Sequence, residues 1–539
     1  MARNLDSDMR TLRQVLDLAQ QHDFAGAAAL AEATLADGFE HPLLLNVAAT
    51  RLEQLGQHDR ALPLLERAVA IAPADVGARN ALGLCLLQLD RPREALLHFD
   101  ELLKRHPELP FAHASRGTTL IALGLPGRAE PSHLQAVQLE PGNFVSLAGL
   151  ASIAAGRGQY SEATRWAERA LALVPGYPDA VLSLAAAQLS RGEQAAAESR
   201  LRQLIIDSRS GPADRARAAG LLGDVLDAGG RYAEAYDCYQ ACNAALTQIY
   251  QYLADANVGA YTRGLCAALE TVNSSGRHRR TSASVSDAAG HVFLLGFPRS
   301  GATLIEVALA GSPRVVSLDE HELLIEGVRA FMREPVDFKS LADAGEAETA
   351  ALQADYWRRV RAAGIETAGK VFIDKHPLNT VKLPLIAKLF PEAKILFAVR
   401  DPRDVVFSCF RRRLQMNPST YECLTLPRAA AFYSATMQLA QSAQLVLGLD
   451  WHEVRHEQLV ADFEREMHAI CQYIGLDWEP SMRDFALRLN GRERATPSTA
   501  QLSHGLISPA MSHWRHYEAQ LSPVLPVLAP WLEKFGYAG

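Results

Sequence analysis

Residues 296–303, GFPRSGAT, have the residue types and spacing of a phosphate-binding loop. The two glycines allow backbone N–H groups to turn toward an anion, and the N-terminus of a following helix favours negative charge. Ala302 stands where nucleotide hydrolases place the lysine that holds the β and γ phosphates. Arg299, inside the loop, can supply positive charge instead. We therefore expect a ligand with a single phosphate joined to another anionic group, rather than a triphosphate.

A second group of anion-binding side chains follows the apolar run KILFAV. Arg400 ends this predicted strand, and Asp401 and Pro402 are favourable residues at the start of a helix. Ser408 and Arg412 then lie one helical turn apart. Arg400, Ser408 and Arg412 can converge on a second phosphate. A charged helix face in contact with water is the alternative.

Both groups lie in a region where short apolar runs alternate with helical patterns. From residue 291 onward the runs are HVFLLGF, KVFIDK, KILFAVR and DWHEVRHEQL. This alternation predicts an α/β domain with a mainly parallel sheet. Ligands of such sheets bind beyond the carboxyl ends of the strands. The two anion-binding groups are therefore expected at one edge of the sheet.

The first half of the chain repeats with a period of 34 residues. Three sets of residues keep this step: Pro73, Pro107, Pro141 and Pro175; Ala27, Ala61, Ala95, Ala129, Ala163 and Ala197; and Gly83 with Gly117. Each unit carries two helical patterns around a short turn, and the proline ends the second helix. The period and these positions resemble the tetratricopeptide repeat, over about residues 10–205, with a looser unit to about 246.

The expected architecture is an α-solenoid followed by an α/β domain with a P-loop-type turn. We expect a tetratricopeptide-repeat superhelix over residues 1–250, a terminal helix and linker over 251–290, and the α/β domain over 291–539. The Ser-, Gly- and Ala-rich segment 271–290 predicts a surface linker. Such repeats offer a concave face to peptides or partner proteins, although they can also serve only as a scaffold.

The second half resembles the sulfotransferases. GFPRSGATL resembles their 5′-phosphosulfate loop, and VRDPRDVVFS resembles their 3′-phosphate motif. IDKHPLN between them, and RHEQLV, TPSTAQL and SHWRHY after them, follow the order found in bacterial sulfotransferases fused to tetratricopeptide repeats. The resemblance extends to the tyrosylprotein sulfotransferases. It implies 3′-phosphoadenylyl sulfate as the donor co-substrate, a hydroxyl acceptor such as protein tyrosine, and no metal.

The resemblance also implies roles for single residues. Glu320 matches the general base, Lys375 matches the lysine that stabilises charge on the bridging and sulfuryl oxygens, and Ser498 matches a serine near the same transition state. The residues matching the 5′ side of the donor site are Arg299, Ser300, Gly301, Ala302 and Thr303, and those matching its 3′-phosphate site are Arg400, Ser408 and Arg412. Glu320 as a surface acid and Lys375 as a strand-end lysine remain alternatives.

Three positions depart from the family pattern. His456 replaces a usual tyrosine, and His513 stands where a basic residue is expected before Trp514. Glu322 occupies the position of an arginine that helps tyrosylprotein enzymes to grip acidic acceptor peptides. The first two substitutions bear on donor affinity, and the third argues against an acidic peptide as acceptor.

The segment 452–456, HEVRH, has the H-E-x-x-H spacing of zinc proteases. That chemistry requires both histidines on one face of a helix. The segment follows the turn-like LGLD and is predicted to form a strand, in which four residues span about 13 Å. We therefore expect no metal site there.

Bulk properties set further expectations. A net charge of −7 gives no general reason to expect nucleic acid as a partner, and seven scattered cysteines suit a reducing, cytoplasmic compartment. No signal peptide or membrane span is expected. The leading hypothesis is a sulfotransferase whose repeats hold a protein or peptide acceptor. The alternatives are a nucleotide-dependent kinase or hydrolase, which Ala302 disfavours, and a repeat adaptor whose second domain binds nucleotide without turnover.

Overall fold

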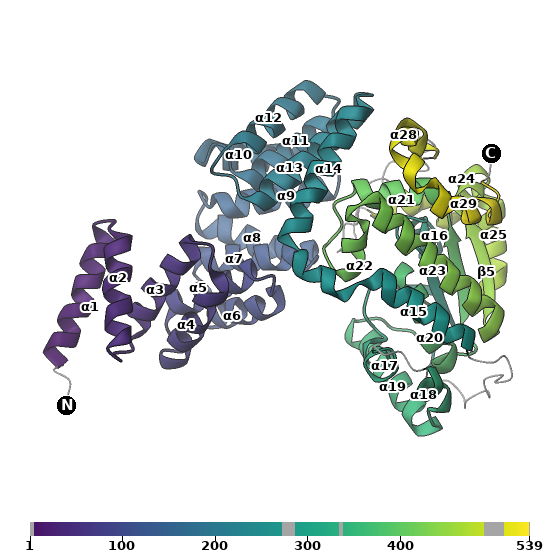
Figure 1. Cartoon of the computed structure of the whole chain (residues 1–539), viewed down its shortest axis with the longest axis horizontal. Helices are drawn as coiled ribbons and strands as arrows, with labels where there is room; N and C mark the ends of the chain where they lie inside the picture. The colour runs from purple at the N-terminus through teal and green to yellow at the C-terminus, as the bar shows by residue number, and fades with distance from the viewer. Residues whose placement is uncertain (1–4, 272–285, 334–337, 490–510, 538–539) are drawn as a thin grey trace. The chain divides into compact units, whose positions relative to one another are not determined.

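The computed structural model describes residues 5–271, 286–333, 338–489 and 511–537 (Figure 1). The described residues pack as two compact units, one that ends at residue 190 and one that begins at residue 191. The helices between residues 191 and 271 thus pack with the sheet-containing part. Domain boundaries at residues 250 and 290 stay a prediction.

The first unit consists of helices that keep the predicted period. They are α1 (Leu5–Gln20), α2 (Phe24–Ala36), α3 (Pro42–Gln54), α4 (His58–Ile71), α5 (Val76–Gln88), α6 (Pro92–Arg105), α7 (Pro110–Ala122), α8 (Pro126–Leu139), α9 (Phe144–Gly156), α10 (Tyr160–Leu173) and α11 (Pro178–Ser190). From α3 onward, the helices that open successive pairs begin at residues 42, 76, 110, 144 and 178. The 34-residue period is therefore a helix-pair repeat, as predicted.

Small residues let the paired helices approach closely. The periodic alanines from Ala27 to Ala163 are almost completely buried. A Cβ on Gly83 in α5 would lie 2.5 Å from a ring carbon of Phe99 in α6, so a larger residue cannot fit. Pro73 follows two residues after the end of α4, where it prevents the helix from continuing.

The second unit begins with further helices and continues into the α/β part. Its helices before the sheet are α12 (Gln194–Ile206), α13 (Pro212–Ala228), α14 (Tyr232–Ile249), η1 (Gln251–Ala256) and α15 (Val258–Thr271). The elements that follow are β1 (Gly290–Gly296), α16 (Ala302–Leu309), β2 (Val315–Asp319), α17 (Ile325–Phe331), α18 (Phe338–Asp343), α19 (Glu346–Ala362), β3 (Val371–Lys375), η2 (Pro377–Lys382), α20 (Leu383–Leu389), β4 (Lys394–Val399), α21 (Pro402–Arg411), α22 (Pro418–Tyr421), η3 (Glu422–Leu424), α23 (Leu426–Leu447), β5 (Asp450–Arg455), α24 (His456–Ala461), α25 (Phe463–Ile474), η4 (Pro480–Asp484), α26 (Phe485–Leu489), η6 (His513–Tyr517), α28 (Glu518–Leu521), η7 (Ser522–Val524) and α29 (Leu525–Lys534).

The five strands form one parallel sheet in the order β2-β3-β1-β4-β5. β1 lies at the centre, so the chain leaves the middle of the sheet into residues 297–301 and then enters α16. The predicted fold class, a helical repeat region followed by an α/β domain with a parallel sheet, is confirmed.

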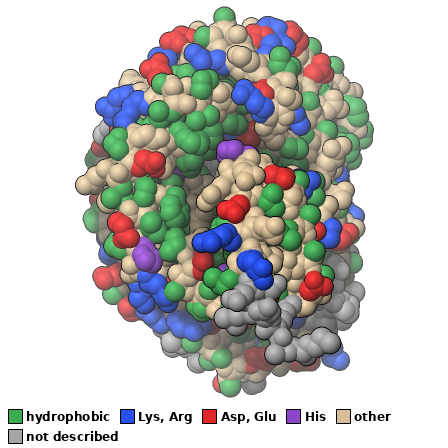
Figure 2. Space-filling model, turned by 90° about the vertical axis from the view of Figure 1, so that its left-hand side faces the viewer, with side chains coloured by type: hydrophobic (Ala, Val, Ile, Leu, Met, Phe, Trp, Pro, Cys, Tyr) green, Lys and Arg blue, Asp and Glu red, His purple; other side chains and the backbone are tan. Residues whose placement is uncertain are grey.

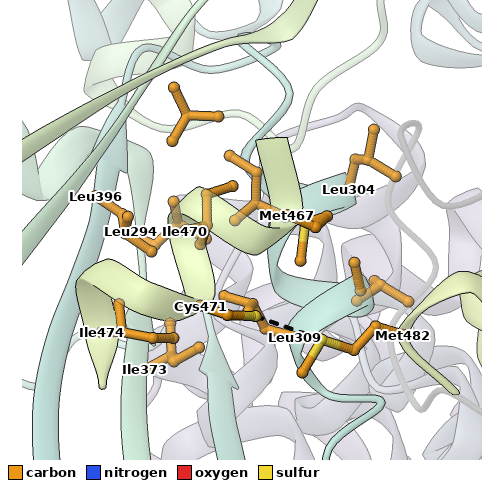
Figure 3. Packing of buried hydrophobic residues seen from close by; sticks show 14 of the residues in the cluster. Leu294, Leu304, Leu309, Ile373, Leu396, Met467, Ile470, Cys471, Ile474 and Met482 are labelled. Carbon is orange, nitrogen blue, oxygen red and sulfur yellow. Dashed lines mark hydrogen bonds between the residues drawn. The ribbon is translucent and has the colours of Figure 1, made fainter. Parts of the chain in front are cut away.

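The sheet is covered on both faces. Val292 and Leu294 of β1 contribute to an apolar cluster with residues of α16 and α25 (Figure 3). Phe293 points to the opposite face, where its ring lies 6.2 Å from Tyr356 and 5.8 Å from Phe390. This alternation is the period of two expected of a strand buried on both sides. It holds the carboxyl ends of β3, β1 and β4 in fixed positions beside one another.

Charge is mixed over the surface. On the face shown in Figure 2, basic and acidic side chains are interspersed among hydrophobic ones. This mixture fits the modest net charge of −7. Every helix in the described ranges is too short or too polar to cross a bilayer.

Candidate active site

The loop after β1 has the strand–loop–helix form predicted for it. Gly296 has φ +145°, and a Cβ there would lie 2.5 Å from the carbonyl oxygen of Ala398 in β4. Gly301, with φ +98°, is the last residue before α16. Arg299 between them also adopts a left-handed conformation, with φ +73°, which is rare for a side chain of this size. Ser300 and Thr303 are buried against the domain.

The structure brings the two predicted phosphate-binding groups together. Arg299 Nε donates to Ser408 Oγ at 3.0 Å, and Arg400 Nη1 donates to the carbonyl oxygen of Arg299 at 3.4 Å. Burial, and then the nearby Arg412 and Arg400, lower the pKa of Arg299 to about 9. Burial also lowers the pKa of the Arg412 guanidinium. Three guanidinium groups that repel one another at the edge of a sheet are suited to bind an anion, which would relieve the repulsion.

The start of α21 holds Arg400 in this position. The Asp401 side chain caps the helix by accepting the backbone N–H of Arg403 at 2.9 Å. Arg400 Nη2 lies 3.5 Å from Asp404 Oδ2. Asp404 in turn accepts the backbone N–H groups of Ser512 and Trp514, at 2.8 and 2.9 Å. The SHWRHY segment thus contributes through its backbone.

A lysine between two carboxylates lies at the ends of β3 and β2. Lys375 Nζ is 2.7 Å from Asp319 Oδ1 and 2.7 Å from Glu320 Oε1. The Lys375 side chain is only 2% exposed, whereas that of Glu320 is 45% exposed. Burial disfavours the charged amine, but Asp319 and Glu320 outweigh this effect and raise the pKa of Lys375 above its usual value. Glu320 is therefore the accessible member of a charged, tightly held group.

The backbone of Glu320 is also unusual. Its φ of +49° lies in the left-handed region, and its N–H donates to the Lys375 carbonyl oxygen at 2.7 Å. Asp319 contributes a second carboxylate to Lys375, a contact that the sequence analysis did not predict. Asp319 is the last residue of β2 and Lys375 the last of β3, and the register of the two parallel strands places them opposite each other.

Asp374, next to Lys375, points to the other face of the sheet. Tyr356 OH donates to Asp374 Oδ2 at 2.8 Å, and His291 Nε2 lies 2.9 Å from the same hydroxyl. Burial raises the pKa of Asp374 to about 6. This carboxylate belongs to the packing beneath the site rather than to its open side.

His456 packs against the phosphate-binding loop. A Cβ on Gly301 would lie 2.6 Å from His456 Nδ1, so the glycine makes room for the imidazole. Burial, followed by Arg400 and Arg299, lowers the pKa of His456 to about 3. A neutral ring therefore stands beside the loop at the position where the resemblance implied a tyrosine, and its N–H can still donate to an anion.

The other two residues that depart from the family pattern, His513 and Glu322, each contact polar or charged side chains nearby. His513 Nε2 lies 2.9 Å from Asp227 Oδ1 and 3.1 Å from Arg411 Nη1. Glu322 lies 3.2 Å from His376 Nε2 and 2.6 Å from Lys382 Nζ. His376, and then Lys382, lower the pKa of Glu322 to about 2 against the effect of burial. Glu322 is thus a charged carboxylate two residues after Glu320.

Two aspartates of α13 were not found from the sequence. Asp227 Oδ2 lies 3.0 Å from Arg411 Nη1. Asp224 Oδ2 lies 2.7 Å from Arg413 Nη2 and 3.7 Å from Arg412 Nη1. Two aspartates from α13 thus pair with the run of three arginines after the 3′-phosphate motif, which leaves an excess of positive charge there. The run of three consecutive arginines was the signal in the sequence. Such a run needs acidic partners wherever it is partly buried.

Ser498 lies outside the described residues. In the H-E-x-x-H segment, His452 lies within β5 and His456 opens α24, so the two histidines do not share a helix.

Comparisons with known proteins agree with this arrangement. Residues 291–480 match the model of the sulfotransferase family, and residues 46–110 match the tetratricopeptide repeat. The chain therefore carries a domain of the sulfotransferase family together with tetratricopeptide repeats.

Several curated proteins are similar to part of the chain. The protein-tyrosine sulfotransferase 2 of Gallus gallus is 27% identical over 46% of this chain and 69% of that protein. The protein-tyrosine sulfotransferase 1 of Danio rerio is 26% identical over 46% of this chain and 72% of that protein. The omega-hydroxy-beta-dihydromenaquinone-9 sulfotransferase of Mycobacterium bovis is 24% identical over 29% of this chain and 43% of that protein. The similarity thus extends to proteins named for different acceptors.

Proposed function

We propose that this protein transfers a sulfuryl group from 3′-phosphoadenylyl sulfate to a hydroxyl acceptor. The observation that carries the proposal is the cluster of Arg299, Arg400 and Arg412 with Ser408, at the same sheet edge as Lys375 and Glu320. The donor has two separate phosphates and no γ-phosphate. This chemistry suits a loop with Ala302 in the lysine position and a second basic group nearby.

Each predicted residue has a role in this proposal. The loop residues Arg299, Ser300, Gly301, Ala302 and Thr303 bind the 5′-phosphosulfate, while Arg400, Ser408 and Arg412 bind the 3′-phosphate. Ser498 completes the site near the sulfuryl group. The lowered pKa values of Arg299 and Arg412 support this assignment, because a dianion would favour their charged forms.

The Lys375 pair with Glu320 suggests how the chemistry begins. Glu320 takes the proton of the acceptor hydroxyl as the oxygen attacks sulfur, and the sulfur–oxygen bond to the 5′-phosphate breaks. Lys375 donates hydrogen bonds to the oxygens on which charge develops. For this contact, the amine must exchange part of its bonding with Asp319 and Glu320 for bonding to the donor, because these carboxylates now hold it.

The acceptor is proposed to be a protein hydroxyl, with tyrosine as the first candidate. Two of the similar proteins are named protein-tyrosine sulfotransferases. Glu322 places a negative charge two residues from the base, so an acceptor surrounded by acidic residues would be repelled. We further propose that the repeats hold this acceptor, and that the protein works in the reducing cytoplasm, which suits its seven free cysteines.

Calorimetry on the full chain tests the donor site. 3′-Phosphoadenosine 5′-phosphate should bind in the presence of a chelator, and ATP with magnesium should bind more weakly. Arg400→Ala should weaken the first ligand by about 1.5–3 kcal/mol, the scale of a charged hydrogen bond. Adenosine 5′-phosphate, which lacks the 3′-phosphate, should lose far less; equal losses would contradict the assignment.

A sulfate-transfer assay separates the enzyme from a nucleotide-binding adaptor. Transfer of labelled sulfate to a phenol should fall strongly in Glu320→Gln and Lys375→Ala, while Glu320→Gln keeps nucleotide affinity. Nucleotide binding without any transfer across a broad set of hydroxyl acceptors would favour the adaptor.

A further inference from the structure

Three chemically reactive side chains meet in the first unit, far from the residues assigned to sulfuryl transfer in the sequence. They are Glu53 near the end of α3, His58 at the start of α4, and Cys85 in α5. One carboxylate oxygen, one imidazole nitrogen and the thiol sulfur all lie within 4.8 Å of one another. Cys85 is completely buried, and the other two are half-buried.

Glu53, His58 and Cys85 differ in type from the residues at the equivalent positions of the next repeat. One period later, the same three positions carry Leu87, Pro92 and Thr119. The position of Glu53 is also apolar in the two following repeats, as Ile121 and Ala155. A carboxylate at a packing position is costly unless it is paired. Three departures that coincide in space call for a reason other than repeat packing.

The local hydrogen bonding leaves room for a ligand. His58 Nδ1 is buried and has no hydrogen-bond partner among the described residues. The Cys85 thiol lies 3.5 Å from the His58 carbonyl oxygen, to which it can donate, and it also interacts with the Glu53 carboxylate. Buried nitrogen atoms of this kind are rarely left unsatisfied. A cation held between the three groups would satisfy the imidazole and neutralise the carboxylate.

The three ligand atoms indicate which metal ion the site would bind. Thiolate sulfur, imidazole nitrogen and carboxylate oxygen together suit Zn²⁺ rather than Mg²⁺ or Ca²⁺, which prefer oxygen ligands. We propose that Glu53, His58 and Cys85 bind one zinc ion, which ties α3, α4 and α5 together and keeps its fourth position for water. Binding forms bonds from Oε, Nδ1 and Sγ to zinc, and the thiol proton is released to solvent.

Cobalt(II), a spectroscopic substitute for zinc, tests the site in the full chain. Titration of the metal-free protein should give a thiolate-to-cobalt charge-transfer band that saturates at one equivalent and is displaced by zinc. Cys85→Ser should abolish the band, and Glu53→Gln should weaken binding. Because surface histidines alone cannot produce this band, adventitious binding elsewhere remains distinguishable.

A repeat-matched variant guards against misfolding. E53L/H58P/C85T installs the residues that occupy the same positions one period later, so it should fold, and it should lose the band and any zinc-dependent rise in melting temperature. Thr119→Ser, at the equivalent of Cys85 in the next repeat, should leave both unchanged. Absence of the band in the unaltered protein, or an equal zinc-dependent stabilisation of the triple variant, would overturn the proposal.

Discussion

In the regular repeats and in the helix pair α13–α14, the paired helices pack in the same way. The two regions differ in the polar contacts made around that packing. In both regions a glycine on the first helix accommodates an aromatic ring sixteen residues later. The pairs are Gly83 with Phe99, Gly117 with His133, and Gly223 with Tyr239. Each ring lies so close that a Cβ on the glycine would be 2.5–2.6 Å from it. The helix-pair geometry is thus retained throughout.

The polar chemistry around that ring changes in the last pair. Phe99 only packs, whereas Tyr239 OH donates to Asp224 Oδ1 at 3.1 Å. Asn243 of α14 donates to the carbonyl oxygen of Phe410 at 2.8 Å, close to the end of α21. The pair α13–α14 thus keeps the packing of a repeat and adds polar contacts that reach the α/β part of the second unit.

The largest expected effect comes from two deletions. Removal of residues 1–190 should leave a folded unit that binds 3′-phosphoadenosine 5′-phosphate. Removal of residues 1–250 takes away α13 and α14, leaving Arg411 and Arg413 without Asp227 and Asp224, and should abolish cooperative unfolding and binding. Scanning calorimetry and nucleotide titration check both. Tight binding by the shorter fragment would show that α13–α14 is dispensable.

The same longer fragment tests the proposed role of the first repeats. It should keep its kcat/KM for a simple phenol and lose activity on the protein acceptor, because tethering raises the local acceptor concentration. A parallel loss on both substrates would mean that residues 1–190 support catalysis in another way.

Single substitutions on α13 should have the next largest effect. Asp224→Ala breaks a buried ion-pair network with Arg412 and Arg413 and should lower the free energy of unfolding of the second unit by about 3–5 kcal/mol. Asp214→Ala, on the same helix, removes an exposed pair with Arg217 and should cost less than about 1 kcal/mol. Denaturant titration compares them; similar losses would contradict the assignment of Asp224 to a buried ion-pair network.

The stability of the regular repeats should depend on pH through His133. His133 is completely buried, and desolvation lowers its pKa to about 4 from 6.5. The unfolded chain therefore binds the extra proton first, so stability is full above pH 6.5 and falls as the pH decreases toward 4. Near pH 5 this linkage should cost the first unit about 2 kcal/mol relative to neutral pH.

His133→Phe, which copies Phe99 one period earlier, should remove this pH dependence. Tyr239→Phe in the second unit is the control, because it keeps His133 and should leave the acid destabilisation of the first unit as large as in the unaltered protein. Unfolding of the first unit measured between pH 7 and 5 checks both. An equal acid destabilisation of the His133→Phe variant would place the titrating group elsewhere.

The sequence predicted much of this molecule because its strongest signals are local. The 34-residue period located the helix pairs, and the apolar runs located β1, β3, β4 and β5. Arg400 and Ser408 were assigned together because one strand and the next helix carry both. Asp224 and Asp227 were missed because their partners lie more than 180 residues away in the sequence. The Asp319–Lys375 pair likewise depends on strand order, which no periodicity encodes.

The backbone of Arg299 and Glu320 has a consequence for evolution and engineering. Both residues have positive φ, +73° and +49°, a conformation that costs a non-glycine residue about 1–2 kcal/mol. Random mutagenesis selected only for heat resistance should therefore favour glycine at Arg299, whereas at Glu320 the loss of the ion pair with buried Lys375 opposes the same change. A glycine variant at Arg299 would be a stabler protein with a poorer donor site. At this position, selection for stability and selection for turnover would favour different residues.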